Sequence, residues 1–301
     1  MNYEEFKNKL VCDVSERLDS SINVTLKQIT KNNGTKFDAL LICEEGRNIA
    51  PTIYIQSFFE EYQKDLDMEN TVNQILDIYR TSMPNANMNI DVFVSYEKCK
   101  DLIVYKVINQ KDNEELLQSI PHYDFLDLSV VYEIMADKFL QSVTNTYKHE
   151  NCEGYVLISS YMLNMWNITE EELREQAIKN TPLLRPHSFR NILEVLGIPA
   201  FEDTEDDKPK MYILTNKSGI HGASAMLYSN VLRDISDELQ SNLFIIPSSI
   251  HEIIIISENE NIDSDDMNSF ISYVNSTNLE PEEILSDHMY YYNRSTNRIV
   301  M

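Results

Sequence analysis

The sequence predicts an α+β protein in which mixed or antiparallel sheets are flanked by helices, arranged in two lobes. Strand-like runs follow one another between helices, an order that favours antiparallel or mixed pairing over a doubly wound parallel sheet. Several segments carry apolar residues every three or four positions, and one carries a complete helix-start signal. We place the lobe boundary near residue 120, so the lobes span residues 1–120 and 121–301.

The first lobe is predicted to begin with a helix, because apolar residues recur at helical spacing from Tyr3 to Leu18. Three strand-like runs follow at 22–29, 37–43 and 52–55. The first two are separated by Asn32-Asn33-Gly34, which is typical of a tight turn. The spacing from Val72 to Tyr79 then predicts a second helix.

The second lobe has clearer boundary signals. We expect strands at 102–108 and 126–135, the first of them still within the first lobe. Thr169 and Glu172 form a capping box, so a helix should start at about residue 170 and stop before Pro182. A short helix over 189–196 should end at Gly197. The stretch 202–209, which begins with five carboxylates in six residues, predicts a solvated acidic linker.

Beyond the linker the apolar pattern alternates between strands and helices. Strands are expected at 211–214, 243–246 and 253–257, with a final edge hairpin at 289–292 and 298–300. One helix should bury a face that runs from Tyr228 to Leu239. A later helix should turn four apolar side chains inward: Met267, Phe270, Ile271 and Val274.

The net charge of −24 limits the classes of partner. A surface with this much negative charge repels phosphate backbones and anionic membranes. We therefore expect no direct nucleic-acid binding and no membrane binding. The first residues lack a signal peptide, and the four cysteines are widely spaced, which favours a cytoplasmic protein with reduced thiols. The charge favours solubility; the alternative is an acidic mimic of nucleic acid that inhibits a DNA-binding enzyme.

Cofactor and metal motifs are missing from the sequence. It contains no phosphate-binding glycine loop, no dinucleotide fingerprint, no nucleophile elbow and no His-Glu-x-x-His. We therefore predict no cofactor and no metal.

The segment Pro247 to Glu252 is the densest set of reactive groups. Ser248 or Ser249 with His251 as base could hydrolyse a substrate, and His251 with Glu252 could face a metal. Adjacent residues of a strand point to opposite faces, which argues against the metal. The alternative, which we favour, is a tight turn whose serine hydroxyls satisfy local backbone groups.

Two further segments are candidates for ligand binding. In the loop 216–222, Gly219 and Gly222 would let the backbone approach a ligand near His221, or would only supply turn geometry. A basic segment could hold a carboxylate or phosphate, or its arginines could pair with nearby acids. Its candidate residues are Arg185, His187 and Arg190.

The chain resembles an uncharacterised domain-of-unknown-function family of gut Firmicutes, number 5688. The resemblance rests on the phrases from Tyr161 to Leu173 and from Ala177 to Thr181, and on 243–252 with its Pro-Ser-Ser-x-His-Glu motif. It covers most of the chain and implies a recurring full-length fold in a bacterial cytoplasm, without an assigned reaction. The C-terminal half is also distantly similar to another uncharacterised bacterial family.

Three hypotheses about function follow. The acidic surface and the missing catalytic motifs favour a non-enzymatic interaction or regulatory protein with protein partners. A hydrolase-like enzyme requires the 216–222 and 247–252 loops to converge, so that His221 joins Ser248, Ser249, His251 and Glu252. The third hypothesis is the acidic mimic.

Overall fold

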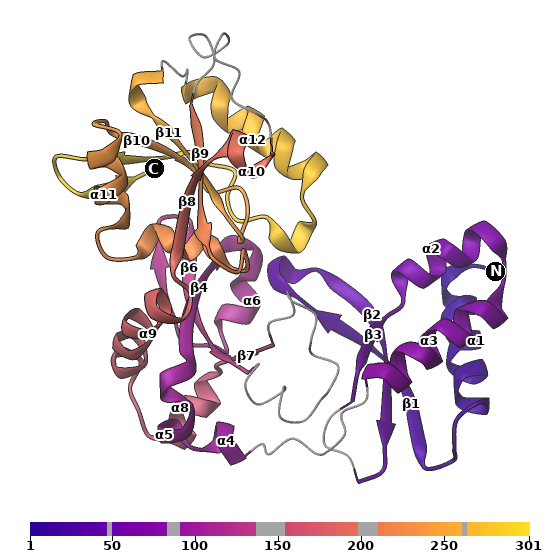
Figure 1. Cartoon of the computed structure of the whole chain (residues 1–301). Helices are drawn as coiled ribbons and strands as arrows, with labels where there is room; N and C mark the ends of the chain where they lie inside the picture. The colour runs from indigo at the N-terminus through magenta and orange to yellow at the C-terminus, as the bar shows by residue number, and fades with distance from the viewer. Residues whose placement is uncertain (47–49, 83–90, 137–153, 198–209, 261–263) are drawn as a thin grey trace. The chain divides into compact units, whose positions relative to one another are not determined.

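The computed structural model describes residues 1–46, 50–82, 91–136, 154–197, 210–260 and 264–301 (Figure 1). Its contacts divide the chain into two compact units, Met1–Asp91 with Ala136–Gly154 and Val92–Met135 with Tyr155–Met301. Both units contain helices and antiparallel sheets, which confirms the predicted α+β class. Residue 120 lies in the second unit, and the lobe boundary proposed there stays a prediction.

The first unit packs helices on a three-stranded antiparallel sheet of order β1-β2-β3. Its elements are α1 (Tyr3–Glu16), β1 (Ile22–Thr30), η1 (Asn32–Gly34), β2 (Lys36–Glu44), β3 (Thr52–Tyr54), α2 (Gln56–Asp65) and α3 (Met68–Ser82). Asn2 caps α1 in a capping box, and Asn33 and Gly34 take the positive φ angles that the tight β1–β2 turn requires. The core contains Phe6, Leu10 and Val14 of α1 packed with residues of the sheet and α3.

The second unit contains two antiparallel sheets. The smaller one has β6 at its centre, paired with β4 on one side and with β5 and β7 on the other. Its elements are α4 (Asp91–Val94), α5 (Tyr96–Cys99), η2 (Lys100–Leu102), β4 (Ile103–Asn109), η3 (Lys111–Asn113), α6 (Glu114–Leu117), β5 (His122–Phe125), β6 (Leu128–Met135), β7 (Tyr155–Leu157), α8 (Ser160–Trp166) and α9 (Glu170–Leu184).

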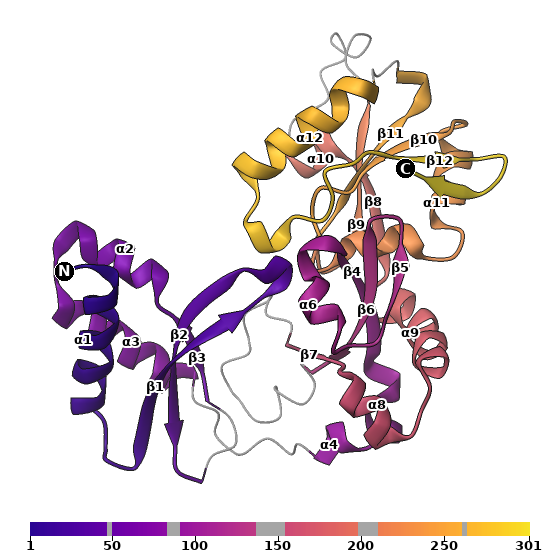
Figure 2. The ribbon, with the colours of Figure 1, turned by 180° about the vertical axis from the view of Figure 1, so that it is seen from behind.

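The larger sheet has six strands in the order β13-β12-β10-β11-β9-β8, of which Figure 2 labels β8 to β12. Its elements are β8 (His187–Asn191), α10 (Ile192–Val195), β9 (Met211–Asn216), η4 (Gly222–Leu227), α11 (Val231–Glu238), β10 (Leu243–Ile246), β11 (Ile253–Ser257), η5 (Glu258–Glu260), α12 (Ser264–Asn278), η6 (Pro281–Glu283), β12 (Tyr290–Asn293) and β13 (Arg298–Val300). One apolar cluster contains residues of both sheets, for example Val107, Val130, Leu214 and Ile253.

Polar contacts reinforce this shared core. In α9, the buried Asn180 donates its amide to the backbone carbonyls of Lys100 and Ile103, and Thr181 Oγ1 accepts from Tyr105 N–H. Asp127, in the turn before β6, accepts hydrogen bonds from Ser286 Oγ and Tyr290 OH. Because these bonds satisfy buried polar groups, they fix the smaller sheet against its neighbours.

Four details of the predicted elements were wrong. The predicted strand 126–135 begins only at Leu128, as β6, because Leu126 takes a positive φ of 56° in the turn that follows the unpredicted strand β5. Helix α9 continues through Pro182, whose missing N–H removes one bond of the last turn while Arg185 N–H still reaches Thr181 O at 2.8 Å. Phe270 is 60% exposed rather than inward.

The fourth correction concerns residues 189–196. Their first part is the edge strand β8, which pairs with β9, and only Ile192–Val195 is helical. The predicted stop at Gly197 is confirmed by its positive φ of 65°. The predicted acidic linker at 202–209 lies outside the described residues. Among the helices that the structure describes, none is long and apolar enough to cross a membrane.

Candidate functional site

A buried carboxylate lies at the centre of the smaller sheet of the second unit. Glu133 is 1% exposed, in the strand β6 whose other residues are almost all apolar and buried. A buried carboxylate is costly unless it is paired and hydrogen-bonded. Glu133 is contacted by basic side chains from three other parts of the second unit, so its site is assembled by the tertiary fold.

Those three side chains are Lys106, Arg185 and His221. Lys106 Nζ lies 3.3 Å from Glu133 Oε2, and Val104 is the cross-strand partner of Glu133, which places Lys106 on the same face of the sheet. Arg185, at the end of α9, donates from Nη2 to Glu133 Oε1 at 2.7 Å and is itself 2% exposed. His221 Nδ1 lies 3.0 Å from the same oxygen.

These contacts decide the charge states of the site. Burial by itself would raise the pKa of Glu133, but Lys106, His221 and Arg185 outweigh burial and hold that pKa well below its usual range. Burial lowers the pKa of His221, and Lys106 and Arg185 lower it further, against the opposing effect of Glu133. At neutral pH the site therefore contains an ionised Glu133 and a neutral His221.

The tautomer of His221 follows from its partner. An ionised carboxylate only accepts hydrogen bonds, so His221 Nδ1 must carry the proton and Nε2 the lone pair. In the described part of the chain, Nε2 has no hydrogen-bond partner. The side chain is 12% exposed, so the site reaches solvent.

His251 lies beside His221 in a nearly parallel stack, with ring centroids 5.9 Å apart and 12° between the planes. The backbone N–H of His221 donates to His251 Nδ1 at 3.3 Å, so the proton of a neutral His251 is on Nε2. That atom faces Glu283 Oε1 at 3.6 Å. In this state, Nε2 of His221 is an unprotonated hydrogen-bond acceptor, and Nε2 of His251 is a hydrogen-bond donor.

Gly222 makes this approach of the two loops possible. A Cβ at this position would overlap Thr215 Oγ1, the carbonyl oxygen of His251 and the backbone nitrogen of Asn216. The loops are also joined by hydrogen bonds from Thr215 Oγ1 to His251 O, at 2.7 Å, and from Ala223 N–H to Ile250 O. The loops 216–222 and 247–252 therefore converge at one place.

His221 adopts a left-handed backbone conformation, with φ of 52°. This conformation is uncommon for residues other than glycine, although His is tolerated there better than most. The ring of Tyr155 packs against the His221 ring, with centroids 5.0 Å apart, and against the Arg185 guanidinium at 4.8 Å. Unusual backbone geometry next to a buried charge cluster is a feature that functional sites often share.

Both candidate serines of the 247–252 loop make backbone hydrogen bonds. Ser249 is 3% exposed, and its Oγ accepts the backbone N–H of His251 at 3.0 Å. Ser248 accepts the N–H of Leu285 through its backbone carbonyl. In the described residues, no serine hydroxyl is hydrogen-bonded to an imidazole nitrogen. Glu252 is half-buried, and burial raises its pKa, with His251 opposing and Glu283 adding to the shift.

The structure places the residues of the basic segment in different surroundings. Arg185 points inward to Glu133, whereas His187 and Arg190 lie exposed on β8. Gly219 has a positive φ of 72° with open space around its missing Cβ, so it meets a turn requirement. Gly222 serves close packing. Ligand binding by Gly219, Gly222, His187 and Arg190 stays a prediction.

Four residues of the site were missed by sequence reasoning: Lys106, Glu133, Tyr155 and Glu283. Two of them carried a signal, because Lys106 and Glu133 are single charges within apolar strand runs. Across the described ranges, no group of three or more His, Cys, Asp or Glu residues could hold a metal ion.

The second unit is therefore an α+β scaffold built around a buried carboxylate and two stacked histidines. The profile of a family of unknown function, DUF5688, matches residues 3–294, and the chain belongs to that family. This confirms the resemblance found from the sequence. The chain is also 21% identical over 245 residues to the UPF0354 protein lwe1624 of Listeria welshimeri, covering 81% of this chain and 78% of that protein. No solved structure matches the chain.

Proposed function

We propose that the protein is a hydrolase-like enzyme that uses His221 as a general base. The observation that carries the proposal is the contact of the neutral His221 with the buried, ionised Glu133, at 3.0 Å through Nδ1. A carboxylate in this position orients an imidazole, selects its tautomer and stabilises the imidazolium that forms during proton transfer. The lone pair on Nε2 is then available to a substrate or water.

The chemistry follows from the positions of the two rings. His221 Nε2 takes a proton from a water molecule, and the water oxygen forms a bond to an acyl or phosphoryl centre. The bond from that centre to the leaving group breaks, and the imidazolium of His221 returns the proton to the leaving group. Besides the imidazolium of His221, His251 Nε2–H can donate a hydrogen bond to the substrate. This scheme uses water as nucleophile, in place of the serines considered from the sequence.

A purely structural role for the Glu133 cluster leaves several of its features unexplained. Buried ion pairs are often replaceable by apolar residues without loss of stability, because desolvation offsets much of their attraction. A structural ion pair also has no need of a second imidazole or of a left-handed His221. The partial exposure of Lys106, His221 and His251, at 19%, 12% and 27% of their side chains, favours a site open to a ligand.

The interaction hypothesis has one specific observation in its favour. Phe270 and Tyr273, one turn apart on α12, are 60% and 66% exposed. Exposed aromatic side chains of this kind are enriched where proteins bind each other. The hypothesis of an acidic nucleic-acid mimic rests on the net charge alone and stays a prediction.

Substitution of His221 by asparagine tests the proposed function. Asparagine tolerates a positive φ and its amide can donate to Glu133, so the fold should persist while the base is lost. The assay is hydrolysis of chromogenic esters, amides, phosphomonoesters and phosphodiesters by the full chain. We expect at least one class to be hydrolysed, and His221→Asn to lower kcat/KM by about 10²-fold or more.

The matched controls are His187→Asn, at an exposed histidine of β8, and Ser248→Ala. Both should keep the wild-type rate if His221 activates water. The proposal fails if no class of substrate is hydrolysed, or if His221→Asn is as active as His187→Asn. Loss of activity in the serine variant alone would replace the water mechanism by a serine nucleophile.

A further inference from the structure

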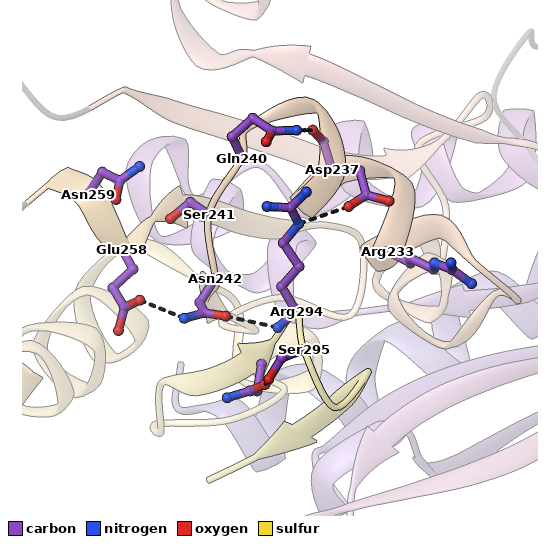
Figure 3. Close-up of a pocket in the computed structure, with 10 residues that line it drawn as sticks. Arg233, Asp237, Gln240, Ser241, Asn242, Glu258, Asn259, Arg294 and Ser295 are labelled. Atoms are coloured by element: carbon purple, nitrogen blue, oxygen red, sulfur yellow. Dashed lines mark hydrogen bonds and ion pairs between the residues drawn. The ribbon is translucent and has the colours of Figure 1, made fainter.

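A pocket elsewhere in the same unit shares no residue with the Glu133 cluster. Its volume is about 570 Å³, and it lies between α11, the connection from α11 to β10, η5 and the β12–β13 turn. Figure 3 shows its lining, which consists of Arg, Asp, Glu, Gln, Asn and Ser side chains. An apolar ligand would gain little there, because burial against polar groups releases no hydrophobic free energy.

Arg294 is a cation of this pocket that hydrogen bonds hold in a fixed position. Its Nε donates to Asp237 Oδ1 at 2.8 Å, and its backbone N–H donates to Asn242 Oδ1 at 2.9 Å. These bonds hold the guanidinium near the middle of the pocket (Figure 3). Among the described residues, Nη1 and Nη2 have no acceptor. A guanidinium fixed through Nε presents a planar pair of donors, which matches the two oxygens of a carboxylate.

Ser241 provides a second, independent observation. The residue is 7% exposed, lines the pocket, and its hydroxyl has no hydrogen-bond partner in the described part of the chain. Leaving a buried hydroxyl unsatisfied costs about 1–3 kcal/mol. The oxygen itself is shielded from solvent, so a rotation of the Ser241 side chain toward the pocket would let a polar ligand supply the missing partner.

Glu258 supplies the opposite charge. Its carboxylate accepts from Asn242 Nδ2 at 2.7 Å and from Tyr291 OH at 3.0 Å, and both of these donors are neutral. In the described residues no cationic side chain forms an ion pair with it. The pocket therefore offers a guanidinium fork that can bind a carboxylate, and a carboxylate without a cation; Asn242 bonds to that carboxylate and to the backbone N–H of Arg294 (Figure 3).

We propose that this pocket binds a small zwitterion of the α-amino-acid class, with its carboxylate on Arg294, its ammonium toward Glu258 and a hydrogen bond to Ser241. A metal ion is disfavoured by the two arginines of the lining, Arg233 and Arg294. A phosphate is disfavoured by Asp237 and Glu258, because like charges repel in a partly desolvated site. A ligand that carries both charges meets both requirements.

The test is calorimetric titration of the full chain with each of the twenty L-α-amino acids. For the tightest binder, the amine without the carboxylate and the acid without the ammonium are titrated next. We expect at least one amino acid to bind with a Kd below about 1 mM, and each single-charge analogue to bind about tenfold more weakly or worse. Binding of an analogue as tightly as the amino acid, or no binding by any of the twenty, would overturn the proposal.

Three variants separate binding from folding. Arg294→Lys keeps the charge but loses the planar fork, and should weaken binding by about tenfold. The matched control is Arg298→Lys on β13, outside this pocket, which should bind as the wild type does. Ser241→Ala removes a hydroxyl that has no partner, so it should weaken binding several-fold without lowering stability. If Arg294→Lys bound the amino acid with wild-type affinity, that result would also contradict the proposal.

Discussion

Replacement of Glu133 by alanine is expected to lower the free energy of unfolding by about 3–5 kcal/mol. The substitution removes the carboxylate that the buried Arg185 guanidinium contacts at 2.7 Å, and it also removes the partner of Lys106 and His221. Breaking a buried ion cluster on one side is costly because the remaining charges keep their desolvation penalty. Few single substitutions elsewhere in the second unit should cost as much.

Urea unfolding followed by circular dichroism measures this effect. The matched control is Glu115→Ala, an exposed glutamate of α6, which should change the free energy of unfolding by less than about 0.5 kcal/mol. A double variant, Glu133→Ala with Arg185→Ala, should cost less than the sum of its two single variants, because the charges are removed together. Equal and small effects of Glu133→Ala and Glu115→Ala would mean that the cluster does not stabilise the fold.

Gly222→Ala is expected to have the second-largest effect, at the upper end of the roughly 1–3 kcal/mol that overpacking costs. The new methyl group would overlap backbone atoms of His251 and Asn216 and the Thr215 hydroxyl, and backbone atoms cannot rotate away. The 216–222 and 247–252 loops would have to separate. His221 would then lose its contact with His251.

The control for this prediction is Gly219→Ala in the same loop. Its Cβ would meet nothing within 4 Å, so its cost is only that of an alanine at a φ of 72°, about 1–2 kcal/mol. The ring signals of both histidines in NMR spectra should shift in Gly222→Ala and stay in place in Gly219→Ala. The steric account is refuted if Gly222→Ala keeps both the wild-type stability and the wild-type ring signals.

Much of the fold could be predicted because local signals were complete. The strands β10 and β11 match their predicted ranges, since each is an apolar run bounded by polar residues. Helix α9 starts where the Thr169 capping box places it. The errors arose where distant partners decide the structure. Residues 189–191 form a strand because β9 offers an edge for pairing, which a local pattern cannot reveal.

The site was predictable only in part, for a related reason. His221 and His251 stood out as members of two polar loops, but their contact depends on the packing of Gly222 against Thr215 and His251. Glu133 and Lys106 were recognisable as charges in apolar strands. The residues that pair with Glu133 come from elements up to 88 positions away, and only the tertiary fold brings them together.

Glu133 orients His221 with its proton on Nδ1, whereas burial, Lys106 and Arg185 keep the imidazole neutral, with a pKa below the ordinary 6.5. Because a depressed pKa in the folded state means that folding opposes protonation, His221 stabilises the fold above pH 6.5, and this contribution is lost as the pH falls.

A pH titration of the histidine ring nitrogens by NMR, with His221→Asn to assign the signals, tests this claim most directly. We expect a neutral His221 protonated on Nδ1 at neutral pH, with a titration midpoint below 6.5. A midpoint at or above 6.5, or a proton on Nε2, would contradict it.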